Sequence, residues 1–284
     1  MSDARPRSAA HACGIVLHPA GHTRSPAMHR AAYAALGIDA TYTAHDVPPE
    51  RLGEALAALR RDGVRQLAVS IPHKEAMLEH VDELEPVARE IGAINTVTLE
   101  DDLWVGTNTD WIGAIRALER AGPVDGQRAV VLGAGGTARA LVYGLRARGC
   151  HVSVLNRTVE RAQILVDELG ASQAAGLERL SELDPEILVN TTSVGMNEDR
   201  SPVPADSLRE GMVVLDAVYA PEETTLLRDA AARGARPVGG KWMLVYQAVE
   251  QLRRWTERLP EPPSEAQLAA MPDVMAHAFD EAET

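Results

Sequence analysis

The strongest constraint on the fold of this chain is a glycine-rich turn. It lies between an apolar run and an alanine-rich run. The turn reads Leu132-Gly-Ala-Gly-Gly-Thr-Ala138; it follows an expected buried strand at 128–132 and opens an expected helix at 138–148. Gly133, Gly135 and Ala138 fit the dinucleotide fingerprint, in which two glycines let a pyrophosphate approach the backbone and a small third residue lets the helix pack close to the strand. Such a turn can also simply end a strand, but the flanking strand and helix favour nucleotide binding.

The next expected strand, 151–155, ends in Asn156-Arg157-Thr158, and Arg161 follows shortly afterwards. In proteins that bind NAD an acidic residue about 20 positions after the glycines bonds the ribose. This chain has a neutral Asn156 and two arginines instead. The arginines could be solvated residues at a helix start. Together with the fingerprint, however, they favour NADP over NAD as the cofactor.

The sequence predicts an α/β protein of two domains. The length of 284 residues fits about two domains, and strand and helix signals alternate along most of the chain. A turn-rich stretch, residues 122–126, is the expected boundary. We therefore expect a substrate-binding domain at 12–112, completed by C-terminal helices within 241–284. A Rossmann-like dinucleotide-binding domain is expected at 123–240, with a cleft between the two domains.

Composition excludes several classes of partner. The net charge of −13 argues against nucleic acid and against anionic membrane surfaces. Cys13 and Cys150 form neither a metal-binding spacing nor a disulfide framework, so we expect no metal. Cys150 precedes an expected strand, and we expect its thiol to be buried. No apolar run approaches a membrane span, and residues 1–12 lack the apolar centre of a signal peptide. These features predict a cytoplasmic protein that binds small molecules.

Lysine is rare in this chain, which makes each lysine a candidate for chemistry. Of 28 basic residues, only Lys74 and Lys241 are lysines. Arg stays protonated in proteins, whereas Lys can exchange a proton. We expect Lys74 at the carboxyl end of a strand over 66–71, where it would open the next helix, and open α/β sheets place ligands at this edge. His73 beside it is expected to be exposed. Chance retention of Lys74 is the alternative.

Two helix starts carry further candidate residues. We expect Ser25 to cap a helix that has Pro26 at its first position and ends at Gly37. Thr23 and Ser25 would place two hydroxyls at that helix start, where a carboxylate ligand is favoured, although capping alone would also explain Ser25. Thr109 and Asp110 are natural caps of the helix expected at 111–120.

The order of these motifs resembles the shikimate dehydrogenase family over residues 13–259. The matching segments are Thr-Arg-Ser-Pro (23–26), Val-Ser-Ile-Pro-His-Lys (69–74), Gly-Ala-Ile-Asn-Thr (92–96), Asn-Thr-Asp (108–110), Gly-Ala-Gly-Gly (133–136), Asn-Arg-Thr (156–158), Asn-Thr-Thr-Ser-Val-Gly-Met (190–196) and Met-Leu-Val-Tyr-Gln (243–247). Any one of them is weak evidence, but their common order makes coincidence untenable.

The resemblance implies NADP-dependent, reversible reduction of 3-dehydroshikimate to shikimate in the pathway to chorismate and the aromatic amino acids. It implies that Lys74 and Asp110 are the catalytic pair. The implied substrate-binding residues are Thr23, Ser25, Ser70, Lys74, Asn95, Asp110, Tyr219 and Gln247. The implied NADP-binding residues are Gly133, Ala134, Gly135, Gly136, Asn156, Arg157, Thr158, Arg161, Thr191, Val218, Gly240 and Met243.

The chain also departs from the family pattern. Thr23 stands where Ser is usual, and Ala68 stands where the family often has Asn. Lys241 and Trp242 replace the Leu-Gly of a Gly-Leu-Gly-Met segment. Relatives that also oxidise quinate carry a similar Val-Ser-x-Pro segment, so a quinate/shikimate dehydrogenase with a broader substrate range or NAD use is an alternative. A non-catalytic ligand sensor on the same scaffold is a second alternative. The expected assembly is a monomer or a homodimer.

Overall fold

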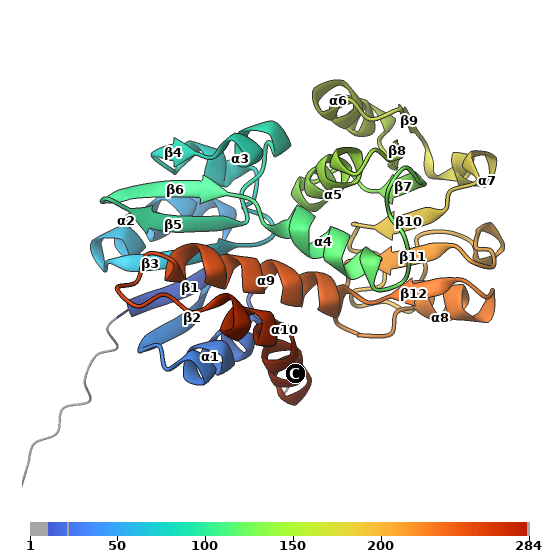
Figure 1. Cartoon of the computed structure of the whole chain (residues 1–284). Helices are drawn as coiled ribbons and strands as arrows, with labels where there is room; N and C mark the ends of the chain where they lie inside the picture. Colours follow the sequence, from blue (N-terminus) through green and yellow to red (C-terminus); the bar gives the residue numbers. More distant parts are fainter. Residues whose placement is uncertain (1–10, 22, 283–284) are drawn as a thin grey trace, which may run out of the picture. The chain divides into compact units, whose positions relative to one another are not determined.

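A computed structural model describes residues 11–21 and 23–282 (Figure 1). Residues 1–10, on which most of the signal-peptide expectation rests, lie outside this part. The chain divides into two compact units. The mixed-sheet unit contains residues up to Glu85, Ile94–Thr107 and the chain from Gln251 onward, and the parallel-sheet unit contains Pro86–Ala93 and Asn108–Glu250. Within the described residues, no helix is long and apolar enough to cross a membrane.

The mixed-sheet unit is built on six strands in the order β2-β1-β3-β5-β6-β4. The strands are β1 (His11–Leu17), β2 (Ala40–Asp46), β3 (Val64–Val69), β4 (Glu83–Leu84), β5 (Thr96–Glu100) and β6 (Leu103–Thr107). The first three are parallel, β5 runs antiparallel to both β3 and β6, and β4 is parallel to β6. The helices outside α9 are α1 (Ser25–Leu36), η1 (Pro49–Arg51), α2 (Leu52–Arg61), η2 (Ala76–Glu79) and α10 (Glu265–Glu281).

The parallel-sheet unit has six parallel strands in the order β12-β11-β10-β7-β8-β9. The strands are β7 (Arg128–Leu132), β8 (His151–Leu155), β9 (Gln173–Ala175), β10 (Ile187–Asn190), β11 (Val213–Asp216) and β12 (Arg236–Val238). Its helices are α3 (Pro86–Ile91), α4 (Asp110–Glu119), α5 (Gly136–Ala147), α6 (Val159–Leu169), η3 (Leu177–Arg179), α7 (Leu180–Leu183), η4 (Ala205–Ser207) and α8 (Thr225–Ala232). The strand order reverses at β7, which is where doubly wound sheets bind nucleotides.

Helix α9 (Gly240–Thr256) is continuous, yet its residues up to Glu250 cluster with the parallel-sheet unit and those from Gln251 with the mixed-sheet unit. The residue ranges of the two units are therefore not the ones expected from the sequence, 12–112 with 241–284 and 123–240. Residues 86–93 cluster with the parallel-sheet unit because the buried Arg139 of α5 donates a 2.5 Å hydrogen bond from Nε to the Ile91 oxygen. Long-range bonds of this kind leave no local pattern in the sequence.

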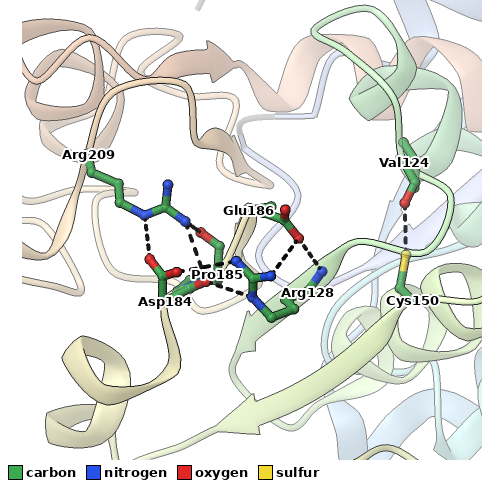
Figure 2. Close-up of polar contacts among 7 residues, drawn as sticks. All are labelled: Val124, Arg128, Cys150, Asp184, Pro185, Glu186 and Arg209. Atoms are coloured by element: carbon green, nitrogen blue, oxygen red, sulfur yellow. Dashed lines mark hydrogen bonds and ion pairs between the residues drawn. The ribbon is translucent and has the colours of Figure 1, made fainter.

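A network of arginines and acidic residues ties the amino ends of β7 and β10 together (Figure 2). Arg128 donates to the main-chain oxygen of Asp184 at 3.1 Å, and its own N–H donates to the Glu186 carboxylate at 2.9 Å. Arg209 bonds the Asp184 carboxylate at 2.9 Å and the Pro185 oxygen at 2.8 Å. This edge of the sheet is opposite to the one at which parallel strands present ligands, so we assign the network to stability.

Three local expectations were wrong. Lys74 lies in a turn after β3, ahead of the short η2, and does not open an α-helix. Ser25 is the first residue of α1, Arg24 is its cap, and Gly37 ends the helix in the left-handed conformation as expected. His73 is buried, with 1% of its surface exposed. Cys150 is buried as expected, and Cys13 is buried as well.

Candidate functional site

In the mixed-sheet unit, three predicted site residues are brought together at the carboxyl end of β3. The Val69 N–H donates to the Asn95 oxygen at 2.8 Å, which places Asn95 beside Ser70. The Ile94 N–H donates to the Lys74 oxygen at 2.8 Å, so the turn that carries Lys74 is bonded to the same segment. Ser70 and Lys74 are half-buried and Asn95 is buried.

The carboxyl end of β1 contributes the remaining two residues at this edge. The His18 N–H donates to the Ile71 oxygen at 3.0 Å, which joins the loop after β1 to the turn after β3. In that loop the Thr23 hydroxyl accepts a hydrogen bond from the Ser25 N–H at 3.3 Å. The Ser25 side chain does not cap α1, and Ser25 itself is 3% exposed. Within this unit, then, Thr23, Ser25, Ser70, Lys74 and Asn95 share one sheet edge.

His73, which sequence reasoning placed at the surface, anchors the turn that carries Lys74. Its imidazole Nε2 donates to the Val47 oxygen at 2.7 Å, and its N–H donates to the Ser70 oxygen at 2.9 Å. Burial lowers the pKa of His73, so the ring is neutral and its single proton is held by this bond. His73, which directly precedes Lys74, therefore holds the main chain of this turn in place.

In the parallel-sheet unit, the glycine-rich turn lies at the carboxyl end of β7. Gly133 has φ +109°, and a Cβ there would lie 2.6 Å from the Thr191 hydroxyl oxygen, so only glycine fits. That hydroxyl donates to the Leu132 oxygen at 2.6 Å, which packs the start of the 191–196 loop against the turn. A Cβ at Gly135 would meet no atom within 4 Å, so the backbone at the start of α5 is open to a ligand.

The predicted 2′-phosphate residues follow the neighbouring strand β8. The Gly133 N–H donates to the Leu155 oxygen at 2.8 Å, so the residues after β8 begin beside the glycine turn. Asn156 bonds the Thr158 oxygen through its amide at 2.8 Å and shapes the loop into α6. Arg157, Thr158 and Arg161 are exposed. Two cations thus stand where an acid would otherwise bind a ribose hydroxyl.

A buried carboxylate that sequence reasoning missed organises the next two strand ends. Asp216 of β11 accepts hydrogen bonds from the Asn190 amide at 2.9 Å, the Thr224 hydroxyl at 2.7 Å and the Val218 N–H at 3.0 Å. Burial raises the pKa of Asp216, although the three hydrogen bonds oppose this. The network fixes Val218, and Tyr219 follows it directly. The sequence signal that could have revealed this residue is an Asp at the end of an apolar strand.

Gly240 and Met243, at the start of α9, lie beside the same strand ends. A Cβ at Gly240 would lie 2.6 Å from the Ala217 oxygen and 2.7 Å from the Val218 oxygen. Trp242, for which the sequence offered no role, has the guanidinium of Arg120, the C-cap residue of α4, 3.6 Å from its ring centroid, which is a cation–π contact. Packing therefore accounts for Trp242.

Asp110 begins α4 and is almost fully buried, with 4% of its surface exposed. Its N–H donates to the Asn108 side-chain oxygen at 3.0 Å, and the Asn108 amide donates to the Ala93 oxygen at 2.9 Å. The hydroxyl of Thr109 donates to the main-chain oxygen of Gln247 at 3.1 Å. Within this unit, Asp110 and Gln247 are thus held by one short segment.

The described residues contain no cluster of His, Cys, Asp or Glu that could hold a metal ion. A doubly wound sheet with a glycine turn, an open helix start and two arginines after the neighbouring strand is typical of a dinucleotide-binding α/β protein. The sequence also matches two family models: the shikimate dehydrogenase substrate binding domain at residues 15–97 and shikimate/quinate 5-dehydrogenase at residues 116–198. The chain belongs to the shikimate dehydrogenase family.

Individual relatives cover nearly the whole chain. The shikimate dehydrogenase (NADP(+)) of Haloarcula marismortui is 48% identical over 245 residues, which are 86% of this chain and 92% of that one. That of Thermococcus kodakarensis is 46% identical and covers 87% and 92%. The structure of shikimate 5-dehydrogenase from Thermus thermophilus with NADP(H) and shikimate superposes with a TM-score of 0.83 at 38% identity and covers 94% and 99%.

Proposed function

We propose that this protein interconverts 3-dehydroshikimate and shikimate with NADP(H), and that Lys74 and Asp110 are its catalytic pair. The observation that carries the proposal is the gathering of Ser70, Lys74 and Asn95 at one strand edge, in a chain with only two lysines among its 28 basic residues. The relatives named shikimate dehydrogenase (NADP(+)) support the same activity.

The residues of the parallel-sheet unit fit NADP. Gly133 permits the tight turn, Gly135 leaves the backbone bare at the start of α5, and the unsatisfied N–H groups of a helix start attract phosphate. Ala134 and Gly136 complete this turn. Arg157 and Arg161 would pair with the 2′-phosphate, with Asn156 and Thr158 shaping their loop. Thr191, Val218, Gly240 and Met243 would line the remainder of the cofactor site.

Lys74 is the proposed proton carrier. When bound, NADPH supplies the hydride that reaches the ketone carbon. Negative charge then grows on the carbonyl oxygen, and an ammonium group at that oxygen stabilises the charge and donates the proton; in the reverse direction the amine takes the proton from the hydroxyl. The proposed role of Asp110 is to bond a ring hydroxyl of the substrate and to orient the Lys74 ammonium.

The other substrate contacts follow from chemistry. The hydroxyls of Thr23 and Ser25 are suited to a carboxylate, and Tyr219 is a further donor. The Asn95 and Gln247 amides can each donate to and accept from ring hydroxyls, as can the hydroxyl of Ser70. Thr23 carries one methyl group more than the usual serine, which would narrow the carboxylate end of the site.

The test follows NADP reduction by absorbance with shikimate as substrate. We expect wild-type turnover, and we expect Lys74→Ala to lower kcat by about 10²–10⁴-fold while NADP still quenches the intrinsic fluorescence with unchanged affinity. Lys74→Arg keeps the charge but cannot shuttle the proton, so it should not restore kcat. Unchanged kcat in Lys74→Ala would remove this lysine from the mechanism.

Quinate in place of shikimate tests the broader activity. An apolar wall discriminates poorly against one added hydroxyl, so the narrow activity rests on the names of the relatives rather than on a residue of this chain. Comparable turnover of quinate would favour a quinate/shikimate dehydrogenase. Ligand binding without any turnover would favour a sensor. A cytoplasmic location and a monomeric or homodimeric state remain predictions.

A further inference from the structure

Helix α9 carries two predicted ligand residues, Met243 and Gln247, one turn apart. Both side chains can act only if the register of α9 against its neighbours is fixed. Successive residues of a helix point about 100° apart, so a register change of one residue would turn both side chains away from the site. Within the parallel-sheet unit, the helix that approaches α9 at these two residues is α4. The contacts between α4 and α9 therefore decide where Met243 and Gln247 point.

The first contact is a hydrogen bond from a side chain to the middle of a helix. The Thr109 hydroxyl donates to the main-chain oxygen of Gln247 at 3.1 Å, across 138 residues of sequence. Thr109 is 1% exposed, so water does not compete for this bond. A helical carbonyl oxygen has a second lone pair beyond the one used along the helix, which lets it accept this donor. The bond ties Gln247 to the residue next to Asp110.

The second contact lies one turn further along α4. A Cβ at Gly113 would lie 2.5 Å from the Met243 oxygen and 2.9 Å from the Gln247 nitrogen. The backbones of the two helices therefore touch at this glycine. Gly113 is bonded in turn to Thr109, because its N–H donates to the Thr109 oxygen at 3.1 Å. The two contacts lie one turn apart on α4, and both bear on Gln247 of α9; the contact at Gly113 also bears on Met243.

The start of α4 is itself fixed. Asn108 accepts from the Asp110 N–H and donates to the Ala93 oxygen, so the segment ahead of the helix is bonded on both sides. Thr109 lies between these bonds. One three-residue segment thus sets the main chain at Asp110 and, through a single hydroxyl, the position of α9.

We propose that Thr109 is a positioning residue for substrate binding: its hydroxyl, with the bare backbone of Gly113, holds α9 at the position where Gln247 meets the substrate and Met243 faces the nicotinamide. The proposal rests on the function proposed above. It differs from a purely stabilising role in one respect. Loss of the hydroxyl should raise the KM for shikimate even in a variant that remains stably folded.

The experiment compares Thr109→Val, which keeps the shape and loses the hydroxyl, with Thr109→Ser, which keeps the hydroxyl. The control is Thr256→Val, since Thr256 is also buried and donates to an α9 oxygen, that of Leu252, at 2.7 Å. We expect Thr109→Val to raise the KM for shikimate by about tenfold, because small misplacements of binding groups are costly. Thr109→Ser should return the KM to near the wild-type value, and Thr256→Val should lower the melting temperature without changing the KM.

Gly113→Ala is an independent second variant, because its methyl group would push α9 away while the Thr109 hydroxyl remains. We expect the same rise in the KM for shikimate, with circular dichroism showing that the variant is folded. Two results overturn the positioning role: wild-type KM in both folded variants, or an equal rise in KM in Thr256→Val. A wild-type protein that does not oxidise shikimate overturns the proposed function itself, and the positioning role with it.

Discussion

The imidazole of His29 stacks on the phenol ring of Tyr42, with centroids 4.2 Å apart and ring planes 7° apart. His29 lies on α1 and Tyr42 on β2, and both side chains are fully buried in the mixed-sheet unit. Tyr33 packs at 6.0 Å from the same imidazole. Burial lowers the pKa of His29 to about 3, and the Gln251 side chain opposes this shift only in part. The core of this unit therefore holds a neutral histidine.

Acid should weaken this unit through His29. As pH falls below about 6.5, His29 takes up a proton in the unfolded chain but not in the folded chain. The contribution of the neutral, buried His29 to the free energy of unfolding is therefore complete above pH 6.5 and is lost as pH falls toward 3. Between pH 6.5 and 5 the loss amounts to about 2 kcal/mol. We expect His29→Phe, which keeps the stacking, to abolish this part of the pH dependence in urea unfolding. His277→Gln, at an exposed histidine, should leave it intact; an unchanged pH dependence in His29→Phe would contradict the assignment.

Gly92 should tolerate alanine poorly. Its φ is +69°, and a Cβ would overlap the Arg139 guanidinium, which is held by the Ile91 oxygen and by Glu168 at 2.5 Å. The control is Gly149→Ala, because Gly149 has φ +74° with open space around it and tests the backbone strain alone. We expect Gly92→Ala to cost about 1–3 kcal/mol more than Gly149→Ala in thermal unfolding, since the arginine must leave its partners. Equal costs would show that Arg139 moves freely.

Two glycines of the turn after β7 should separate folding from cofactor binding. Gly135 has an extended backbone and room for a methyl group, so Gly135→Ala should keep the melting temperature of the free protein. The same methyl would keep a pyrophosphate away, and we expect the Kd for NADP to rise at least about tenfold. Gly133→Ala should lose stability as well, because of the contact with Thr191. Titration calorimetry beside thermal unfolding distinguishes the two effects.

The preference for NADP should depend on Arg157 and Arg161. Replacing both with alanine removes the cations proposed to bind the 2′-phosphate. We expect the KM for NADP to rise by about tenfold or more, since each hydrogen bond to a charged group contributes about 1.5–3 kcal/mol when buried and less when exposed. The KM for NAD should not change. Arg179→Ala, at an exposed arginine paired with Glu182, is the control; equal loss for NAD and NADP would contradict the assignment.

Sequence patterns predicted the local parts of this structure well. The strands at 128–132 and 151–155 were predicted with their observed bounds, and the glycine turn was placed correctly between strand and helix. Apolar runs and glycines report on neighbouring residues, which is why these elements could be found.

The rest depended on contacts between distant residues. The turn around Lys74 is shaped by bonds to residues near 95 and by the His73 imidazole on Val47, and a helix signal in the sequence could not reveal either. The Thr109 bond to Gln247 ends on a main-chain oxygen, which any residue at 247 would present. The site residues themselves came from the resemblance, and their supporting bonds came from the structure.

The mixed-sheet unit combines segments that precede and follow the parallel-sheet unit in the sequence, and this has a consequence for biosynthesis. Helix α1 packs against α10 (Figure 1). The Gln251 amide donates to the Asn95 oxygen at 3.0 Å. On the ribosome, all residues of the parallel-sheet unit have been made once Glu250 has been added, whereas β1 and α1 still lack α10 at that point. Helix α1 is therefore made before the parallel-sheet unit and finds its partner helix only after it, and a chain that stops at 250 would carry every residue of the parallel-sheet unit beside an incomplete mixed-sheet unit.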